Sequence, residues 1–296
     1  MLTAFIMLTK DCPRGCVWCY NRFFPPPAGD RLRGSAAEAV ARLRQLGVEQ
    51  LILTGGEPAA LPELEDWLRA AAAAGLATAL VTNGEGLQAA TVARWREAGL
   101  AALTVSLPAV ADADLPTVEG VLADAQARLA AARAGGLEAF TLLACVTRDN
   151  IEHIAALIDW SVRQHAALLL QPLFLPADHP EVKRSLAHIT GEEWAELDTA
   201  MRPWAESNQC GGYYQLWLDL YLELGASPIS CFMGSEGMVV DPDGSIAPCF
   251  HRRDLRCGNL FDDDPREIIF KLFAANDEVI DAPCFGRHCL SLFADR

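Results

Sequence analysis

The chain has 296 residues, enough for one large domain with an appendage or for two ordinary domains. No apolar run is long enough to span a membrane, and a formal charge of −15, from 39 acidic and 24 basic residues, argues against a nucleic-acid partner. The same charge permits a cationic substrate, because carboxylates around a cleft concentrate positive ligands.

Short apolar runs alternate with longer helical patterns from residue 3 to about residue 174. We expect strands at 4–8, 51–53, 78–81, 103–107, 139–146 and 168–174. We expect helices at 35–46, 61–74, 87–98, 118–134 and 151–165. Six β-then-α units in a row predict an α/β fold, a partial (β/α)6 TIM-like barrel with its helices outside. In such barrels the chemistry lies at the carboxyl ends of the strands.

This pattern ends after residue 174. Residues 191–206 and 213–224 have helical spacing, and residues 238–247 read as a hairpin with Asp243-Gly244 at its turn. We therefore expect a barrel domain over residues 1–206 and a small cysteine-rich domain over residues 207–296. The first residues form an apolar run without a basic start or a cleavage site, which predicts a buried strand and a cytosolic protein.

Ten cysteines are many for a cytosolic chain, where disulfides are disfavoured and clustered thiols more often serve metals or catalysis. Three of them lie in Cys12-Pro-Arg-Gly-Cys16-Val-Trp-Cys19, on the loop after the first expected strand. A C-x3-C-x2-C triplet can hold three corners of a cubane cluster and leave the fourth iron open, whereas most protein [4Fe–4S] sites use four cysteines. The alternatives are a zinc site that lacks its fourth ligand and a triplet of core cysteines.

With Trp18 before its last cysteine, this triplet resembles the signature of the radical S-adenosylmethionine (SAM) superfamily. Thr54-Gly55-Gly56-Glu57-Pro58, at the end of the second expected strand, resembles the GGEP motif of that family. Asn83 and Ser106, at the ends of the third and fourth strands, match places where family members contact SAM.

The resemblance implies a [4Fe–4S] cluster on Cys12, Cys16 and Cys19. It also implies that SAM binds against Trp18 and the strand ends, with glycines that let the backbone approach its methionine amino group and a glutamate that holds the turn. In this family, reductive cleavage of SAM yields a 5′-deoxyadenosyl radical that abstracts hydrogen from an unactivated C–H bond.

A second cysteine set, Cys231, Cys249, Cys257, Cys284 and Cys289, resembles the auxiliary-cluster module called twitch, a shortened relative of the SPASM module. The resemblance implies a second [4Fe–4S] cluster; a structural zinc is the alternative. Five thiols leave one spare, and a match to twitch proteins would make Cys257 the spare.

Local chemistry favours the opposite assignment of the spare thiol. Arg252, Arg253 and Arg256 favour a thiolate, and hence a ligand, at Cys257. The apolar neighbours of Cys249 favour a neutral thiol. We therefore expect Cys249 to be a catalytic thiol and Cys231, Cys257, Cys284 and Cys289 to be ligands. Cys145 and Cys210 are expected to pack as small apolar residues.

The size, the spare thiol and the acidic charge are together most similar to radical SAM aminoglycoside epimerases, which convert neomycin C to neomycin B. The adenosyl radical would remove hydrogen from one face of a sugar carbon, and the cysteine would return hydrogen from the other. The implied partners are a cationic aminoglycoside and an electron donor such as flavodoxin or ferredoxin. Candidate ammonium-binding carboxylates are those of Asp178, Glu181, Asp219, Glu223, Asp241 and Asp243. A radical SAM dehydrogenase of an aminocyclitol or sugar and a radical SAM peptide maturase are the alternatives.

Overall fold

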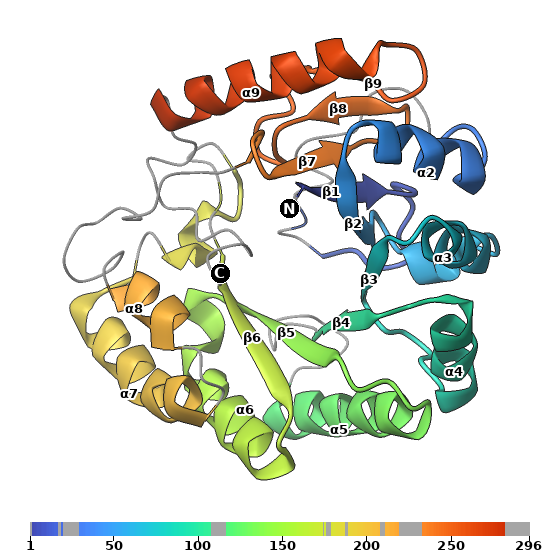
Figure 1. Cartoon of the computed structure of the whole chain (residues 1–296). Coiled ribbons are helices and arrows are strands. Elements are labelled where there is room, and N and C mark those ends of the chain that lie inside the picture. Colours follow the sequence, from blue (N-terminus) through green and yellow to red (C-terminus); the bar gives the residue numbers. More distant parts are fainter. Residues whose placement is uncertain are drawn as a thin grey trace.

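The computed structural model describes residues 2–16, 19, 30–107, 117–173, 175, 179–186, 189–207, 211–218 and 233–281. Parallel strands in these residues pair in the order β6-β5-β4-β3-β2-β1, so each lies beside its neighbour in sequence. They are β1 (Leu2–Met7), β2 (Val48–Thr54), β3 (Ala77–Thr82), β4 (Ala102–Ser106), β5 (Phe140–Val146) and β6 (Ala167–Pro172). The strands curve around a centre and the helices lie outside (Figure 1). The predicted partial (β/α)6 barrel is confirmed.

The described helices that precede the predicted hairpin are α2 (Ala36–Gln45), α3 (Leu64–Ala73), α4 (Ala89–Ala98), α5 (Val118–Ala134), α6 (Ile151–Gln164), α7 (Gly191–Ser207) and α8 (Gly211–Leu218). They begin close to the predicted positions and α2 to α7 also end close to them, whereas residues 219–224 of the last predicted helix lie outside the described residues. The Ser35 hydroxyl caps α2 by accepting from the Glu38 N–H at 3.2 Å. Helix α4 ends at Gly99, whose φ of +112° is open to glycine and costly for other residues. No described helix is long and apolar enough to cross a membrane.

The C-terminal part extends the same sheet. The predicted hairpin is present as β7 (Gly237–Val240) and β8 (Ser245–Ala247), and β9 (Gly258–Asn259) pairs with β8. Strand β7 pairs in parallel with β1, so the hairpin continues the barrel sheet on the side away from β2. Helix α9 (Pro265–Asp281), which the sequence analysis did not anticipate, covers β7 and β8 (Figure 1). The domain boundary at residue 207 stays a prediction.

The two faces of β1 belong to different cores. Ala4 and Ile6 lie in the large core formed with the helices, because helices cover the outer face of the sheet. Phe5 and Met7 alternate with them and pack in a separate cluster with Val239 of β7. This second cluster therefore lies on the inner face, toward the centre of the barrel.

Candidate active site

The loop that carries Cys12, Cys16 and Cys19 leaves the carboxyl end of β1 and is closed at its base. The backbone N–H of Lys10 donates to the carbonyl of Asp30 at 3.0 Å, and Lys10 Nζ lies 2.6 Å from the Asp30 carboxylate. The Cys12 residue is exposed, Cys16 and Cys19 are half-buried, and none of the three forms a disulfide. The barrel thus presents these thiols where its chemistry is expected.

Gly55 and Gly56 pack directly against the start of this loop. The Gly56 N–H donates to the Thr9 carbonyl at 2.6 Å, and the Glu57 N–H donates to the Asp11 carbonyl at 2.7 Å. A Cβ on Gly55 would lie 2.3 Å from the Thr9 carbonyl oxygen, and one on Gly56 would lie 2.1 Å from that of Asp11. Glycine is required here because the cysteine loop fills the space of any side chain. Their predicted role toward SAM stays a prediction.

The Glu57 carboxylate joins two neighbouring strand ends. It accepts from the Ala59 N–H at 2.9 Å, from the Thr82 hydroxyl at 2.5 Å and from the Asn83 N–H at 2.7 Å. Only 4% of Glu57 is exposed, and Pro58 is buried beside it in the first turn of a 3-10 helix (Pro58–Ala60). The carboxylate therefore holds the turn after β2, as predicted from the sequence, and ties it to the loop after β3.

Asn83 brings that loop to the first cysteine. Its side-chain Nδ2 lies 4.0 Å from Cys12 Sγ, and its Oδ1 accepts from the Glu85 N–H at 2.8 Å. Burial raises the pKa of the Cys12 thiol, the neighbouring Glu57 and Cys19 raise this pKa further, and hydrogen bonds from the Arg14 backbone and the Asn83 side chain oppose the rise. The structure thus brings together Cys12, Cys19, Glu57 and Asn83.

Arg128 of α5 completes this arrangement, and the sequence analysis missed it. Its Nη1 donates to the carbonyls of Asn83 and Ser106, the latter at 3.4 Å, and its Nε lies 2.6 Å from the Asp124 carboxylate. Burial lowers the pKa of this guanidinium, which is 3% exposed, while Asp124 raises the pKa. Arg128 thus fixes the ends of β3 and β4, on which the predicted residues Asn83 and Ser106 lie. The sequence contained one signal for this role: Arg128 lies on the same face of α5 as the buried Ala125, which indicates a buried arginine.

The thiols of the cysteine loop fit an iron–sulfur cluster by their donor chemistry. In the described residues no three His, Cys, Asp or Glu side chains are close enough to hold one metal ion. Thiolates on a single tetrahedral zinc would stand about 3.8 Å apart, since Zn–S bonds are about 2.3 Å. In a cubane cluster each thiolate binds a different iron, and three thiols on one loop can supply three such ligands. Trp18 lies outside the described residues.

Cys249 and Cys257 lie on opposite faces of the extended sheet. Cys249, which is 9% exposed, packs with Phe5, Met7 and Val239 on the inner face. Cys257, which is 1% exposed, belongs to the outer core beneath α9. Cys231, Cys284 and Cys289, the other predicted ligands, and Cys210 lie outside the described residues.

The argument that neighbouring arginines favour a thiolate at Cys257 is wrong. Arg252 pairs with Asp254 at 3.1 Å, and Arg253 pairs with Asp241 at 3.0 Å. Burial raises the pKa of Cys257 to about 11, and its Sγ donates to the Leu255 carbonyl at 3.5 Å. The roles of Cys249 and Cys257 themselves stay predictions.

The described candidate carboxylates already have partners. The Glu181 carboxylate lies 2.7 Å from Arg184, Asp241 pairs with Arg253, and Asp243 accepts from the N–H and hydroxyl of Ser245. Each of these three therefore already serves a contact within the protein. Asp178, Asp219 and Glu223 lie outside the described residues.

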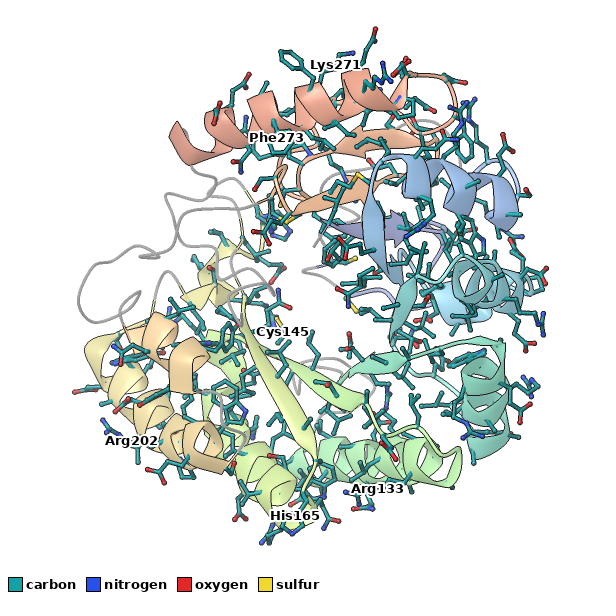
Figure 2. The ribbon with its side chains drawn as sticks, in the orientation of Figure 1. Arg133, Cys145, His165, Arg202, Lys271 and Phe273 are labelled. Atoms are coloured by element: carbon teal, nitrogen blue, oxygen red, sulfur yellow. The ribbon has the colours of Figure 1, made fainter. Side chains whose placement is uncertain are left out.

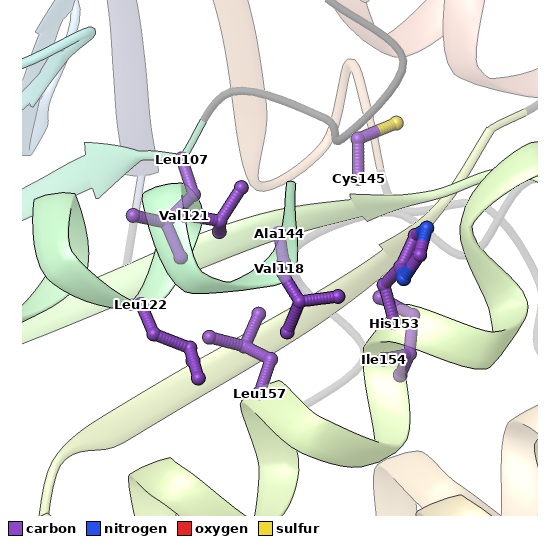
Figure 3. A pocket seen from close by; sticks show the side chains of 9 residues that line it. All are labelled: Leu107, Val118, Val121, Leu122, Ala144, Cys145, His153, Ile154 and Leu157. Carbon is purple, nitrogen blue, oxygen red and sulfur yellow. The ribbon is translucent and has the colours of Figure 1, made fainter. Parts of the chain in front are cut away.

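Cys145 differs from its predicted apolar packing. It alternates on β5 with the buried Ala144 and Val146, is half-buried, and points toward the centre of the barrel (Figure 2). The residue also borders a cavity of about 20 Å³ between β5, α5 and α6, together with His153 and Leu157, but its sulfur points away from the other lining side chains (Figure 3). That volume holds about one water, so it is no substrate site.

Comparisons with known proteins identify relatives of this chain. The chain is 28% identical over 250 residues to a "PqqA peptide cyclase" of Rhizobium meliloti and 32% identical over 260 residues to one of Ruegeria pomeroyi. Each match covers 82% of this chain, which spans only 65% and 66% of the relatives' lengths.

Solved structures share the fold. "Native anSMEcpe with bound AdoMet" matches with a TM-score of 0.65 and 19% identity, over 95% of this chain and 83% of the other. BtrN in complex with AdoMet and 2-DOIA matches with a TM-score of 0.55 and 13% identity, over 94% of this chain and 87% of the other.

Two family profiles match the chain. The profile described as the radical SAM superfamily covers residues 6–161, which include the cysteine loop and the ends of β1 to β5. The profile of the SPASM iron-sulfur cluster-binding domain covers residues 231–289. The chain therefore belongs to the radical SAM superfamily, and its cofactors are a [4Fe–4S] cluster, SAM and an auxiliary iron–sulfur cluster.

Proposed function

We propose that this radical SAM enzyme inverts a carbon centre of an aminoglycoside, of the neomycin C to neomycin B type, and that Cys249 returns hydrogen to the inverted carbon. The observation that carries the proposal is the placement of Cys249 on the inner face of the sheet, beside β1. Strand β1 also leads into the loop of Cys12, Cys16 and Cys19. A thiol on that face can meet a substrate bound at the mouth of the barrel, whereas Cys257 is beneath α9.

When bound, the catalytic cluster and SAM supply the one-electron chemistry that removes a hydrogen atom from the substrate. Loss of that atom leaves a carbon radical, and the Cys249 thiol donates a hydrogen atom to its opposite face. A C–H bond forms and the S–H bond breaks, which leaves a thiyl radical on Cys249. One electron and one proton restore the thiol, with the electron supplied by a reduced donor such as flavodoxin or ferredoxin.

The environment of Cys249 supports this role. A hydrogen-atom donor must stay a neutral thiol, and apolar surroundings disfavour the thiolate. Phe5, Met7 and Val239 provide such surroundings. The charge of −15 suits a polycationic substrate, although no described carboxylate is assigned to bind it.

Peptide maturation is the second candidate, and the names of the relatives favour it. Both relatives described above are named PqqA peptide cyclases, and those names mention neither an epimerase nor an aminoglycoside. A peptide maturase would use the same barrel and clusters, and Cys249 would then be a core residue or a ligand. The match to BtrN with AdoMet and 2-DOIA shows the shared fold alone.

One anaerobic assay separates the two candidates. The reconstituted enzyme is incubated in deuterium oxide with SAM and dithionite, with either neomycin C or a PqqA-type precursor peptide. We expect an epimer of neomycin C that carries one deuterium at the inverted carbon, because a thiol proton exchanges with solvent. A modified peptide and unchanged neomycin C would replace the proposal by peptide maturation.

A further inference from the structure

A buried ion pair joins the end of β7 to the segment that follows Cys249. Asp241 follows the last residue of β7, and its carboxylate lies 3.0 Å from Arg253 Nε. The two side chains are 3% and 8% exposed. In the described residues no other ion pair has both partners below a tenth exposed.

The Arg253 guanidinium makes further contacts that join the Cys249 segment to β1. It donates to Met7 Sδ and lies 5.5 Å from the centre of the Phe250 ring. The Phe250 ring meets that of Phe5 edge-on, with 5.5 Å between ring centres. Met7 and Phe5 are the two β1 residues in these contacts, and both lie on the inner face. They therefore attach residues 249–253 to that face, Met7 through Arg253 and Phe5 through Phe250.

The backbone between Cys249 and Arg253 is short and closed. The Arg252 N–H donates to the Cys249 carbonyl at 3.1 Å, which forms a tight turn. A displacement of Arg253 is therefore transmitted to Cys249 through this turn. The thiol cannot leave the inner face while Arg253 remains bound to Asp241 and Met7.

A buried ion pair is seldom a net source of stability, because desolvation offsets the attraction of the charges. Its better-attested effect is to select one arrangement over others, since breaking it leaves a charge without a partner. Here the selected arrangement is the position of Cys249.

We infer that the Asp241–Arg253 ion pair positions Cys249, because it fixes residues 249–253 on the inner face of β1 and thereby directs the thiol into the barrel. Arg253 is thus a positioning residue for the hydrogen return of the proposed function, on which this role rests. The placement of the thiol itself is a property of the folded chain and can be measured without a substrate.

The test compares Arg253→Met with Arg252→Met in the reconstituted holoenzyme. Arg252 belongs to the same loop, but its partner is Asp254, whose side chain is 62% exposed. Two quantities are measured: the rate at which iodoacetamide alkylates Cys249, located by peptide mass spectrometry, and the epimer formed per 5′-deoxyadenosine from neomycin C. The first needs no turnover, so it remains informative if neomycin C is not the substrate.

For Arg253→Met we expect at least tenfold faster alkylation of Cys249. We also expect at least tenfold less epimer per 5′-deoxyadenosine, while 5′-deoxyadenosine formation stays within twofold of wild type. Arg252→Met should stay within twofold on both quantities. If Arg253→Met loses its iron, Asp241→Asn replaces it, with a smaller change of about threefold expected because the amide keeps the shape of the side chain and removes only its charge. Unchanged alkylation, or an equal change in the Arg252 variant, would overturn the inference.

Discussion

The buried carboxylate of Glu57 offers a quantitative test of how the site is assembled. In Glu57→Ala, the Thr82 hydroxyl and the N–H groups of Ala59 and Asn83 lose their acceptor. A hydrogen bond to a charged group contributes about 1.5–3 kcal/mol, and a buried donor left without a partner costs about 1–3 kcal/mol. The bond to Thr82 is buried and the two N–H groups are partly buried, so water compensates in part for the latter. We expect a total loss of about 3–5 kcal/mol.

Glu57→Gln should lose less stability, about 1–2 kcal/mol. The amide oxygen can still accept a hydrogen bond, but the amide NH2 replaces the other acceptor with a donor. The matched control is Glu65→Ala on α3. Glu65 forms ion pairs at the surface with Arg69 and Arg94, so its removal should cost less than about 1 kcal/mol.

The free energies of unfolding are measured by anaerobic urea titration of the reconstituted enzyme, with far-UV circular dichroism as the signal. A change in midpoint at constant slope reports a change in stability. If Glu57→Ala lies within about 1 kcal/mol of wild type, or no further from wild type than Glu65→Ala, the carboxylate does not hold the two strand ends together.

Three further predictions concern other residues of the account. Replacing Cys12, Cys16 and Cys19 together by Ala should remove about half of the iron and all SAM cleavage, so 5′-deoxyadenosine from this variant would contradict the cluster assignment. Arg128→Met should cost about 2–4 kcal/mol of stability by urea titration, because the carbonyls of Asn83 and Ser106 and the Asp124 carboxylate lose their partner; a change below about 1 kcal/mol would count against this role. Burial lowers the pKa of His251 to about 4, so the unfolded chain takes up its proton first as pH falls. Stability should then decline between about pH 6.5 and about pH 4 by at most about 3 kcal/mol, and His251→Gln should remove this decline; equal pH profiles would refute it.

The barrel could be predicted from the sequence because its signals are local. Each expected strand is an apolar run, and the helix expected over residues 87–98 does end at Gly99, which has a positive φ. Asn83 and Glu57 could be placed together for the same reason, since carboxyl ends of adjacent parallel strands meet at one edge.

What the sequence could not provide depends on contacts between distant residues. The pairing of β7 with β1 joins residues more than 200 positions apart, and it decides that Cys249 faces inward. The arginines before Cys257 were read as its electrostatic neighbours, but Arg253 binds Asp241 and Arg252 binds Asp254. Helix α9 was missed although Ile268, Leu272 and Ala275 have helical spacing, and it is this helix that buries Cys257.

Paired serine variants of the two described tail cysteines separate the hydrogen donor from the cluster ligand. Iron content, 5′-deoxyadenosine and epimer are measured for Cys249→Ser and Cys257→Ser under the same anaerobic conditions with neomycin C. We expect Cys249→Ser to keep the iron of both clusters and to form 5′-deoxyadenosine but no epimer, while Cys257→Ser loses auxiliary-cluster iron. Loss of auxiliary-cluster iron from Cys249→Ser, with full iron and no epimer in Cys257→Ser, would contradict this assignment.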